Sequence, residues 1–281
     1  MNISITECPR DAMQGLQSII PTVQKIEYLN LLSQVGFTIL DAGSFVSAKA
    51  IPQMADSKEV FENITHSKSN LLAIVANERG AKEALLHPNI EYLGFPLSIS
   101  ETFQQRNTNK SIAEAIAELK KINELANLQN KKTRVYLSMG FGNPYGDDFS
   151  ISLLLDFVNQ LINLGISHIV PSDTTGSSTP NLLNEVYSQL QAQFPNNNFG
   201  CHLHATYDEA LAKIEAAFEA GVKDFDSAFL GFGGCPMASN SLTGNIPTEI
   251  LVDFLEKKGV DLGFDLEKFE QAKWKAQQIF Y

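Results

Sequence analysis

Two histidines in the run FGCHLHAT, His202 and His204, carry the clearest chemical signal in this sequence. Residues two apart on a β-strand point to the same face, so this spacing directs both imidazoles toward one spot. Imidazole nitrogens are the commonest protein ligands of metal ions. The same spacing also suits two histidines that pack or form hydrogen bonds at a strand end. The residues around the pair therefore have to distinguish a metal site from simple packing.

Eight short β-rich runs alternate with amphipathic stretches along the chain. The runs lie near residues 3–7, 37–41, 71–76, 90–95, 134–139, 167–171, 199–204 and 223–229. Such alternation predicts parallel strands joined by right-handed crossovers, and eight units close into a barrel. We therefore expect an α/β fold, a (β/α)8 TIM barrel with extra C-terminal helices, in one catalytic domain over residues 1–281.

An open doubly wound sheet is the alternative fold. It would need a glycine-rich phosphate turn after the first strand, and the sequence CPRDAMQG offers none. The residues between the runs instead favour short turns that lead from each strand into a helix. The expected helix starts are the capping boxes Ser111 with Glu114 and Thr206 with Glu209, and the cap Thr179 followed by Pro180.

Polar side chains follow several of the expected strands, where a TIM barrel carries its chemistry. They are Arg10, Asp11 and Gln14 after the first strand, Asp41 and Ser44 after the second, Asp173 after the sixth, and Cys235 and Asn245 in the glycine-rich segment after the eighth. Because the barrel closes on itself, Asp11 should lie near the histidine strand, although beside Arg10 it also fits a surface ion pair. A carboxylate, two imidazoles and the amide oxygen of Asn245 suit Mg²⁺ or Mn²⁺, with Zn²⁺ not excluded.

One other class of metalloprotein and two interpretations of Cys235 have to be weighed beside this ligand set. Two histidines and a carboxylate also occur in non-haem iron oxygenases, but those usually have all-β folds, and the helical periodicity argues against that class. Cys235 lies between Gly234 and Pro236. A free cysteine is usually a small packing residue, and the other interpretation is a loop that brings a thiol over the metal.

Composition limits the partners. The chain has 281 residues and a formal charge of -11, from 32 acidic and 21 basic residues, so its field repels nucleic acid. Three cysteines are too few for a secreted disulfide framework. The sequence shows no export signal and no run near the roughly 20 apolar residues of a membrane span. We expect a cytoplasmic protein that binds no membrane.

Several segments, in their order and approximate spacing, resemble those of hydroxymethylglutaryl-CoA lyases, a family of metal-dependent lyase and Claisen-synthase barrels. The segments are ECPRDAMQG, DAGSFVSAKAIPQMAD, LSMGFGNPYGD, SDTTGSSTP, HLHAT and GFGGCPMA followed by TGNIPTE. The resemblance runs from about residue 3 to residue 255. It implies cleavage of 3-hydroxy-3-methylglutaryl-CoA into acetyl-CoA and acetoacetate in a (β/α)8 barrel with Mg²⁺ or Mn²⁺, and it suggests a homodimer.

The resemblance also implies roles for individual residues. The implied metal ligands are Asp11, His202, His204 and Asn245, the implied catalytic residues are Arg10 and Cys235, and Glu249 is implied as a supporting residue. The chemistry of the reaction adds His202 as a catalytic residue, Gln14 and Ser44 as substrate contacts, Asp173 as a substrate contact or an alternative base, and Asp41 as a supporting residue. Arg10 would hold the enolate oxygen, His202 would move a proton, and Cys235 would protonate the carbanion. Lys49 and Arg106 are candidate contacts for the CoA phosphates.

Other functions stay open at this point. Isopropylmalate and homocitrate synthases run condensations on the same kind of barrel, but they usually carry a further C-terminal region and lack a matching GGCP loop. A protein that binds a metal or a CoA ester without turnover is the third option. The chain also departs from many lyases at Ala12, Asp41, Gly43 and Ala205, and its segment from Cys235 to Asn245 is one residue longer.

Overall fold

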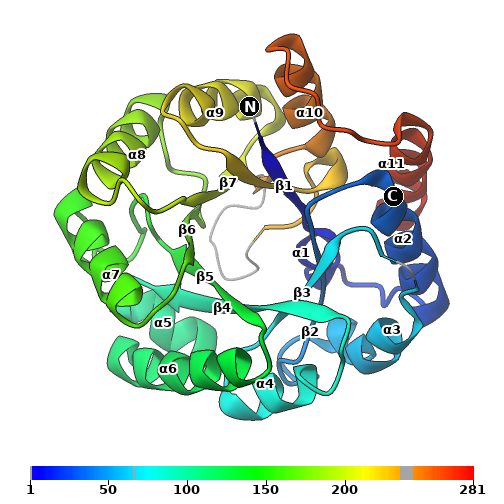
Figure 1. Cartoon of the computed structure of the whole chain (residues 1–281), viewed down its shortest axis with the longest axis horizontal. Helices are drawn as coiled ribbons and strands as arrows, with labels where there is room; N and C mark the ends of the chain where they lie inside the picture. Colours follow the sequence, from blue (N-terminus) through cyan, green and yellow to red (C-terminus); the bar gives the residue numbers. More distant parts are fainter. Residues whose placement is uncertain (1, 66, 235–242) are drawn as a thin grey trace.

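Eight parallel strands pair in chain order and close into a barrel, because the first strand also pairs with the eighth (Figure 1). The structure, a computed structural model, describes residues 2–65, 67–234 and 243–281. The barrel strands are β1 Ser4–Glu7, β2 Ile39–Ser44, β3 Asn70–Ile74, β4 Ile90–Ser98, β5 Lys132–Ser138, β6 His168–Asp173, β7 Gly200–Ala205 and β8 Asp224–Ser227. All eight agree with the runs expected from the sequence, so the TIM barrel is confirmed.

Helices surround the barrel as an outer ring (Figure 1). The helices of the described residues are α1 Pro9–Gln14, which lies inside this ring, α2 Thr22–Val35, α3 Ser57–Asn63, α4 Glu78–Ala84, α5 Glu101–Thr108, α6 Ile112–Leu128, α7 Ile151–Asn163, α8 Pro180–Gln193, α9 Tyr207–Glu219, α10 Thr248–Lys257 and α11 Leu266–Phe280. Two 3-10 turns, η1 Pro52–Met54 and η2 Phe229–Gly231, and the short strand β9 Gly244–Asn245 lie in the connections. Among the described residues, no helix is both long and apolar enough to span a bilayer.

The helix starts follow the expected chemistry. Capping boxes open α6 at Ser111 and α9 at Thr206, and the side chain of Thr179 accepts a hydrogen bond from the first turn of α8. The expected C-terminal helices are present as well. The last of them, α11, lies against α2, where Lys275 Nζ is 2.8 Å from Glu27 Oε2 (Figure 1).

The barrel interior is divided between apolar and charged side chains. An inner apolar cluster contains Ile39, Leu72, Ile74, Tyr92, Tyr136 and Val170. On β5 the residues alternate, so that Val135 and Leu137 belong to the outer core, whereas Tyr136 belongs to the inner cluster. Arg134, on the same side as Tyr136 by this alternation, is fully buried and paired with Asp224 and Asp226 of β8. Because barrel interiors are usually filled by branched apolar residues, this charged group is unusual.

Candidate functional site

The short helix α1 brings three polar side chains to the end of β1. Arg10 and Gln14 are one helical turn apart, and Asp11 and Gln14 are three residues apart, so all three side chains meet. Asp11 Oδ1 accepts hydrogen bonds from Arg10 Nη1 at 3.0 Å and from Gln14 Nε2 at 2.6 Å. Burial alone would raise the pKa of Asp11, but the charges of Arg10, His202 and His204 lower it to about 2. This carboxylate is therefore ionised at neutral pH.

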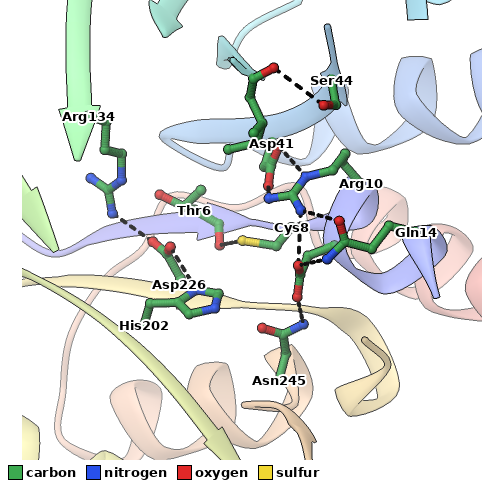
Figure 2. Close-up of polar contacts among 12 residues, drawn as sticks. Thr6, Cys8, Arg10, Gln14, Asp41, Ser44, Arg134, His202, Asp226 and Asn245 are labelled. Carbon is green, nitrogen blue, oxygen red and sulfur yellow. Dashed lines mark hydrogen bonds and ion pairs between the residues drawn. The ribbon is translucent and has the colours of Figure 1, made fainter. Parts of the chain in front are cut away.

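Arg10 lies between Asp41 on one side and Asp11 and Gln14 on the other (Figure 2). Its Nε donates to Asp41 Oδ1 at 3.1 Å and its Nη2 donates to Asp41 Oδ2, a bidentate pair. Its Nη1 also donates to Gln14 Oε1 at 2.9 Å. Burial raises the pKa of Asp41 to about 6, although Arg10 opposes that rise. Asp41 thus fixes the guanidinium plane.

The two histidines of β7 face each other, with 3.2 Å between their Nε2 atoms. The Nδ1 atom of His204 lies 3.0 Å from the carbonyl oxygen of Thr174, which can only accept, so His204 carries its proton on Nδ1. Burial and the neighbouring His202 lower the pKa of His204 to about 4. Burial alone would lower the pKa of His202, but its hydrogen bond with Asp226 raises it. The pair therefore holds at most one extra proton near neutral pH.

Asp11, His202 and His204 each direct one ligand atom into a common space, with those atoms within 4.8 Å of one another. The strand β9 pairs antiparallel with β7 and sets Asn245 opposite His204. The amide nitrogen of Asn245 donates to Asp11 Oδ2 at 2.6 Å and to the carbonyl oxygen of Phe232 at 2.9 Å. With its nitrogen occupied, Asn245 keeps its amide oxygen as the remaining ligand atom. Two imidazole Nε2 atoms this close together, beside a carboxylate, fit a divalent cation.

A cavity of about 420 Å³ opens beside this cluster. The residues that line it include Arg10, Asp11, Gln14, Arg106, Tyr136, Ser138, Ser172, Thr174, His202 and His204. Its wall joins the ends of several strands to α5. A cavity of this size with a few convergent polar groups is typical of a small-molecule site.

Not every expected site residue reaches this cavity. Ser44 lines a second cavity of about 940 Å³, and its hydroxyl is 3.4 Å from the carbonyl oxygen of Ile74. Asp173 is buried beneath the loop after β6, where its carboxylate accepts from Ser178 and, at 2.9 Å, from Lys213. Among the described contacts, both side chains already have partners within the protein.

Two further expectations concern the segment after β8. Glu249 does not line the cavity, and its Oε2 accepts from the backbone N–H of Leu230 at 3.1 Å. Leu230 has a positive φ of 63°, so this hydrogen bond supports a strained turn at the start of the glycine-rich segment. Cys235 lies outside the described residues.

Three residues with a clear place in the site were missed by the sequence reasoning. Tyr136 lines the cavity, and its hydroxyl is buried without a hydrogen-bond partner in the described structure. Asp226 and Arg134 lie behind His202 (Figure 2). The signal that could have found them is charge at alternate positions of β-rich runs, in DFDS and around RVY. Charges buried inside a barrel are costly unless they are paired, so charged residues within a barrel strand indicate a buried ion pair.

The sequence profile of the HMGL-like family matches residues 3–274 of the chain. The chain belongs to this family. Its relatives there include the hydroxymethylglutaryl-CoA lyase of Bacillus subtilis, 37% identical over 268 residues that cover 95% of this chain and 89% of the relative. A mouse relative named as the mitochondrial hydroxymethylglutaryl-CoA lyase is 34% identical, over 94% of this chain and 81% of its own length.

Solved structures in the family agree in fold. The HMG-CoA lyase from Acinetobacter baumannii, solved in complex with coenzyme A and 3-methylmalate, superposes with a TM-score of 0.92 at 32% identity. The match covers 99% of this chain and 91% of that one. This HMGL-like chain therefore shares the whole barrel, and not only a motif, with a CoA-binding relative.

Proposed function

We propose that this chain is a carbon-carbon lyase that cleaves 3-hydroxy-3-methylglutaryl-CoA into acetyl-CoA and acetoacetate with Mg²⁺ or Mn²⁺. The observation that carries the proposal is the convergence of Asp11, His202 and His204 at one cavity, in a member of the HMGL-like family. The family relatives named above carry this activity in their names. Asn245 completes the proposed ligand set.

The reaction makes two demands on the site. The C3 hydroxyl of the substrate must lose its proton, and the electron pair of the C2–C3 bond must move into the thioester carbonyl. A divalent cation bound by the proposed ligands would lower the pKa of that hydroxyl and orient it. His202 is the proposed proton shuttle, because an imidazole changes its charge near neutral pH.

Arg10 is suited to stabilise the enolate oxygen. It donates four hydrogen bonds, to Asp11, Gln14 and Asp41. A guanidinium has five N–H groups, so among the described contacts one N–H on Nη2 is left for a substrate oxygen. Because its partners hold it in place, the charge needs no reorganisation when the oxyanion develops.

The other expected residues receive narrower roles. We propose that Gln14, which lines the cavity, also contacts substrate oxygens. Ser44 and Asp173 are proposed to support their loops, because partners within the protein already occupy them. Cys235 is proposed to protonate the acetyl-CoA carbanion from the glycine-rich segment.

The CoA part of the substrate extends from the same cavity. Arg106 lines the cavity with its guanidinium carbon 4.7 Å above the Tyr145 ring centroid, and we propose it as a contact for the CoA phosphates. We also propose that residues 1–281 form one catalytic domain, that the chain forms a homodimer and that it acts in the cytoplasm, although the mouse relative is named for the mitochondrion.

A product assay tests this function. The protein is stripped of metal with a chelator, and acetoacetate release from the CoA ester is measured with and without Mg²⁺ or Mn²⁺. We expect acetoacetate only when the cation is restored. Condensation of acetyl-CoA with a keto acid would identify a synthase instead, and binding of the ester without either reaction would identify a non-catalytic protein.

A further inference from the structure

A chain of three charged or titratable side chains runs through the barrel behind the metal-site candidates (Figure 2). Arg134 on β5 donates from Nη2 to Asp226 Oδ1 at 2.7 Å. The other carboxylate oxygen, Asp226 Oδ2, lies 3.1 Å from His202 Nδ1. Three different strands, β5, β8 and β7, therefore meet at one carboxylate, and the far end of that connection is the imidazole that faces Asp11 and His204.

Burying the charges of Arg134 and Asp226 costs free energy, and the fold leaves space for them. The side chains of Arg134 and Asp226 are both 0% exposed, and buried charges are unfavourable unless each is well paired. A Cβ atom at Gly200 of β7 would lie 3.0 Å from Arg134 Nη2, so only glycine leaves the arginine its space without displacement. Arg134 also pairs with Asp224 at 2.6 Å, which balances its charge.

We propose that Asp226, oriented by Arg134, is a positioning residue that holds His202 with its proton on Nδ1 and its Nε2 lone pair toward Asp11 and His204. This inference rests on the proposed function, because the lone pair matters only if the cluster binds a cation. An arginine can only donate, so Oδ1 of Asp226 must serve it, and Oδ2 is left to accept from His202.

The two histidines are thereby held by different acceptors. His204 donates from Nδ1 to a neutral carbonyl, that of Thr174, whereas His202 donates to an ionised carboxylate. A carboxylate behind a ligating imidazole fixes the ring and makes it a more basic ligand. Asp226 thus makes His202 the more basic ligand of the pair, and in the neutral ring it leaves Nε2 free of a proton.

A competing interpretation places a separate metal between Cys8, His202 and Asp226, whose ligand atoms also lie within 4.8 Å of one another. The contacts oppose it. Both oxygens of Asp226 are already engaged, and Cys8 Sγ is directed to the carbonyl oxygen of Thr6 at 3.7 Å. Burial also raises the pKa of the Cys8 thiol, and this opposes formation of the thiolate that metals bind.

The substitution Asp226→Asn tests the proposal through the tautomer of His202. Arg134 would orient the new amide so that its oxygen faces the guanidinium and its NH2 faces His202. His202 would then have to accept at Nδ1 and carry its proton on Nε2. Proton–nitrogen NMR correlation of the histidine rings, in the metal-free protein at a pH where the ring is neutral, measures this directly; a His202→Gln spectrum assigns the signal.

We expect a proton on Nδ1 in the unmodified protein and on Nε2 in Asp226→Asn. The affinity for Mn²⁺, measured by electron paramagnetic resonance, should fall at least about tenfold in the variant. The matched control is Asp224→Asn, which changes the other partner of Arg134 and leaves the contact of Asp226 with His202 intact. It should keep both the tautomer and the affinity.

Three results would overturn the proposal. They are a proton on Nε2 of His202 in the unmodified protein, the same tautomer in both proteins, or equal effects of Asp224→Asn and Asp226→Asn. The first needs no variant, so the test holds even if Asp226→Asn does not fold. The tautomer is also read without turnover, so a protein that shows the switch but cleaves no CoA ester would contradict the proposed function alone.

Discussion

At the scale of single residues, the site is a set of groups that fix one another. Asp11 accepts from Arg10, Gln14 and Asn245, and each of these has a second partner that holds it. The sequence could predict these residues because each comes after a strand end and lies within a segment that resembles the family. Arg134 and Asp226 could not be placed in the same way, because they lie within strands, and only closure of the barrel brings β5 across to β8.

Tyr136 offers the clearest test of a single atom. The residue lines the cavity, and its buried hydroxyl has no hydrogen-bond partner in the described structure. We expect Tyr136→Phe to leave the free energy of unfolding unchanged or slightly higher, because no hydrogen bond is lost. If the hydroxyl binds a substrate oxygen, kcat/KM should fall about tenfold, close to the value of one hydrogen bond. Steady-state kinetics and urea unfolding measure both, and a loss of stability with unchanged kinetics would rule out a substrate contact.

At the scale of elements, short segments place the ligands. The two-residue strand β9 brings Asn245 opposite His204 on β7. Two residues are too few to show a period, so the sequence predicted Asn245 as a ligand from its place after the eighth strand and from the resemblance, but it did not predict this strand. The eight barrel strands were predictable from β-rich runs that alternate with amphipathic stretches, several of which begin at a recognisable helix start.

The loop after β6 is tied to β7 by a buried lysine of α9. Lys213 Nζ lies 2.9 Å from Asp173 Oδ2, from the carbonyl oxygen of Gly176 and from that of His204. Because Lys213→Ala leaves the buried carboxylate of Asp173 unpaired, we expect a loss of about 3–5 kcal/mol in the free energy of unfolding.

The matched control is Lys257→Ala, whose partner Asp253 lies one turn away on the surface of α10. That exposed pair should contribute almost nothing to stability. Urea unfolding of the two variants measures the difference. Equal and small effects in both would show that Lys213 does not hold the loop.

At the scale of the whole molecule, a buried carboxyl group on the first strand holds the segment that follows the last strand. Glu7 on β1 accepts from the backbone N–H of Phe229 at 2.9 Å and from Thr248 Oγ1 at 2.5 Å, and so joins the first strand to η2 and α10. Burial raises the pKa of Glu7 from 4.5 to about 8, although these two hydrogen bonds oppose the rise. The carboxyl is therefore protonated in the fold at neutral pH.

This shift makes stability depend on pH. Between pH 4.5 and about 8 the folded chain holds a proton on Glu7 that the unfolded chain releases, so stability falls as the pH rises through this window. The loss is about 1.4 kcal/mol per pH unit. Glu7→Gln should match the unmodified protein at acidic pH and become increasingly more stable up to about pH 8.

Chemical unfolding across this pH range measures the effect. Glu256→Gln, at an exposed position of α10, controls for the loss of one negative charge. If both variants followed the same pH dependence as the unmodified protein, Glu7 would not be the group that limits stability at alkaline pH.

We propose that Asp11, His202, His204 and Asn245 surround one divalent cation. Anomalous scattering from a crystal soaked in Mn²⁺ would locate that cation. We expect one strong anomalous peak per chain in contact with these four side chains. A peak that touches neither histidine, or none at a Mn²⁺ concentration that supports turnover, would contradict it.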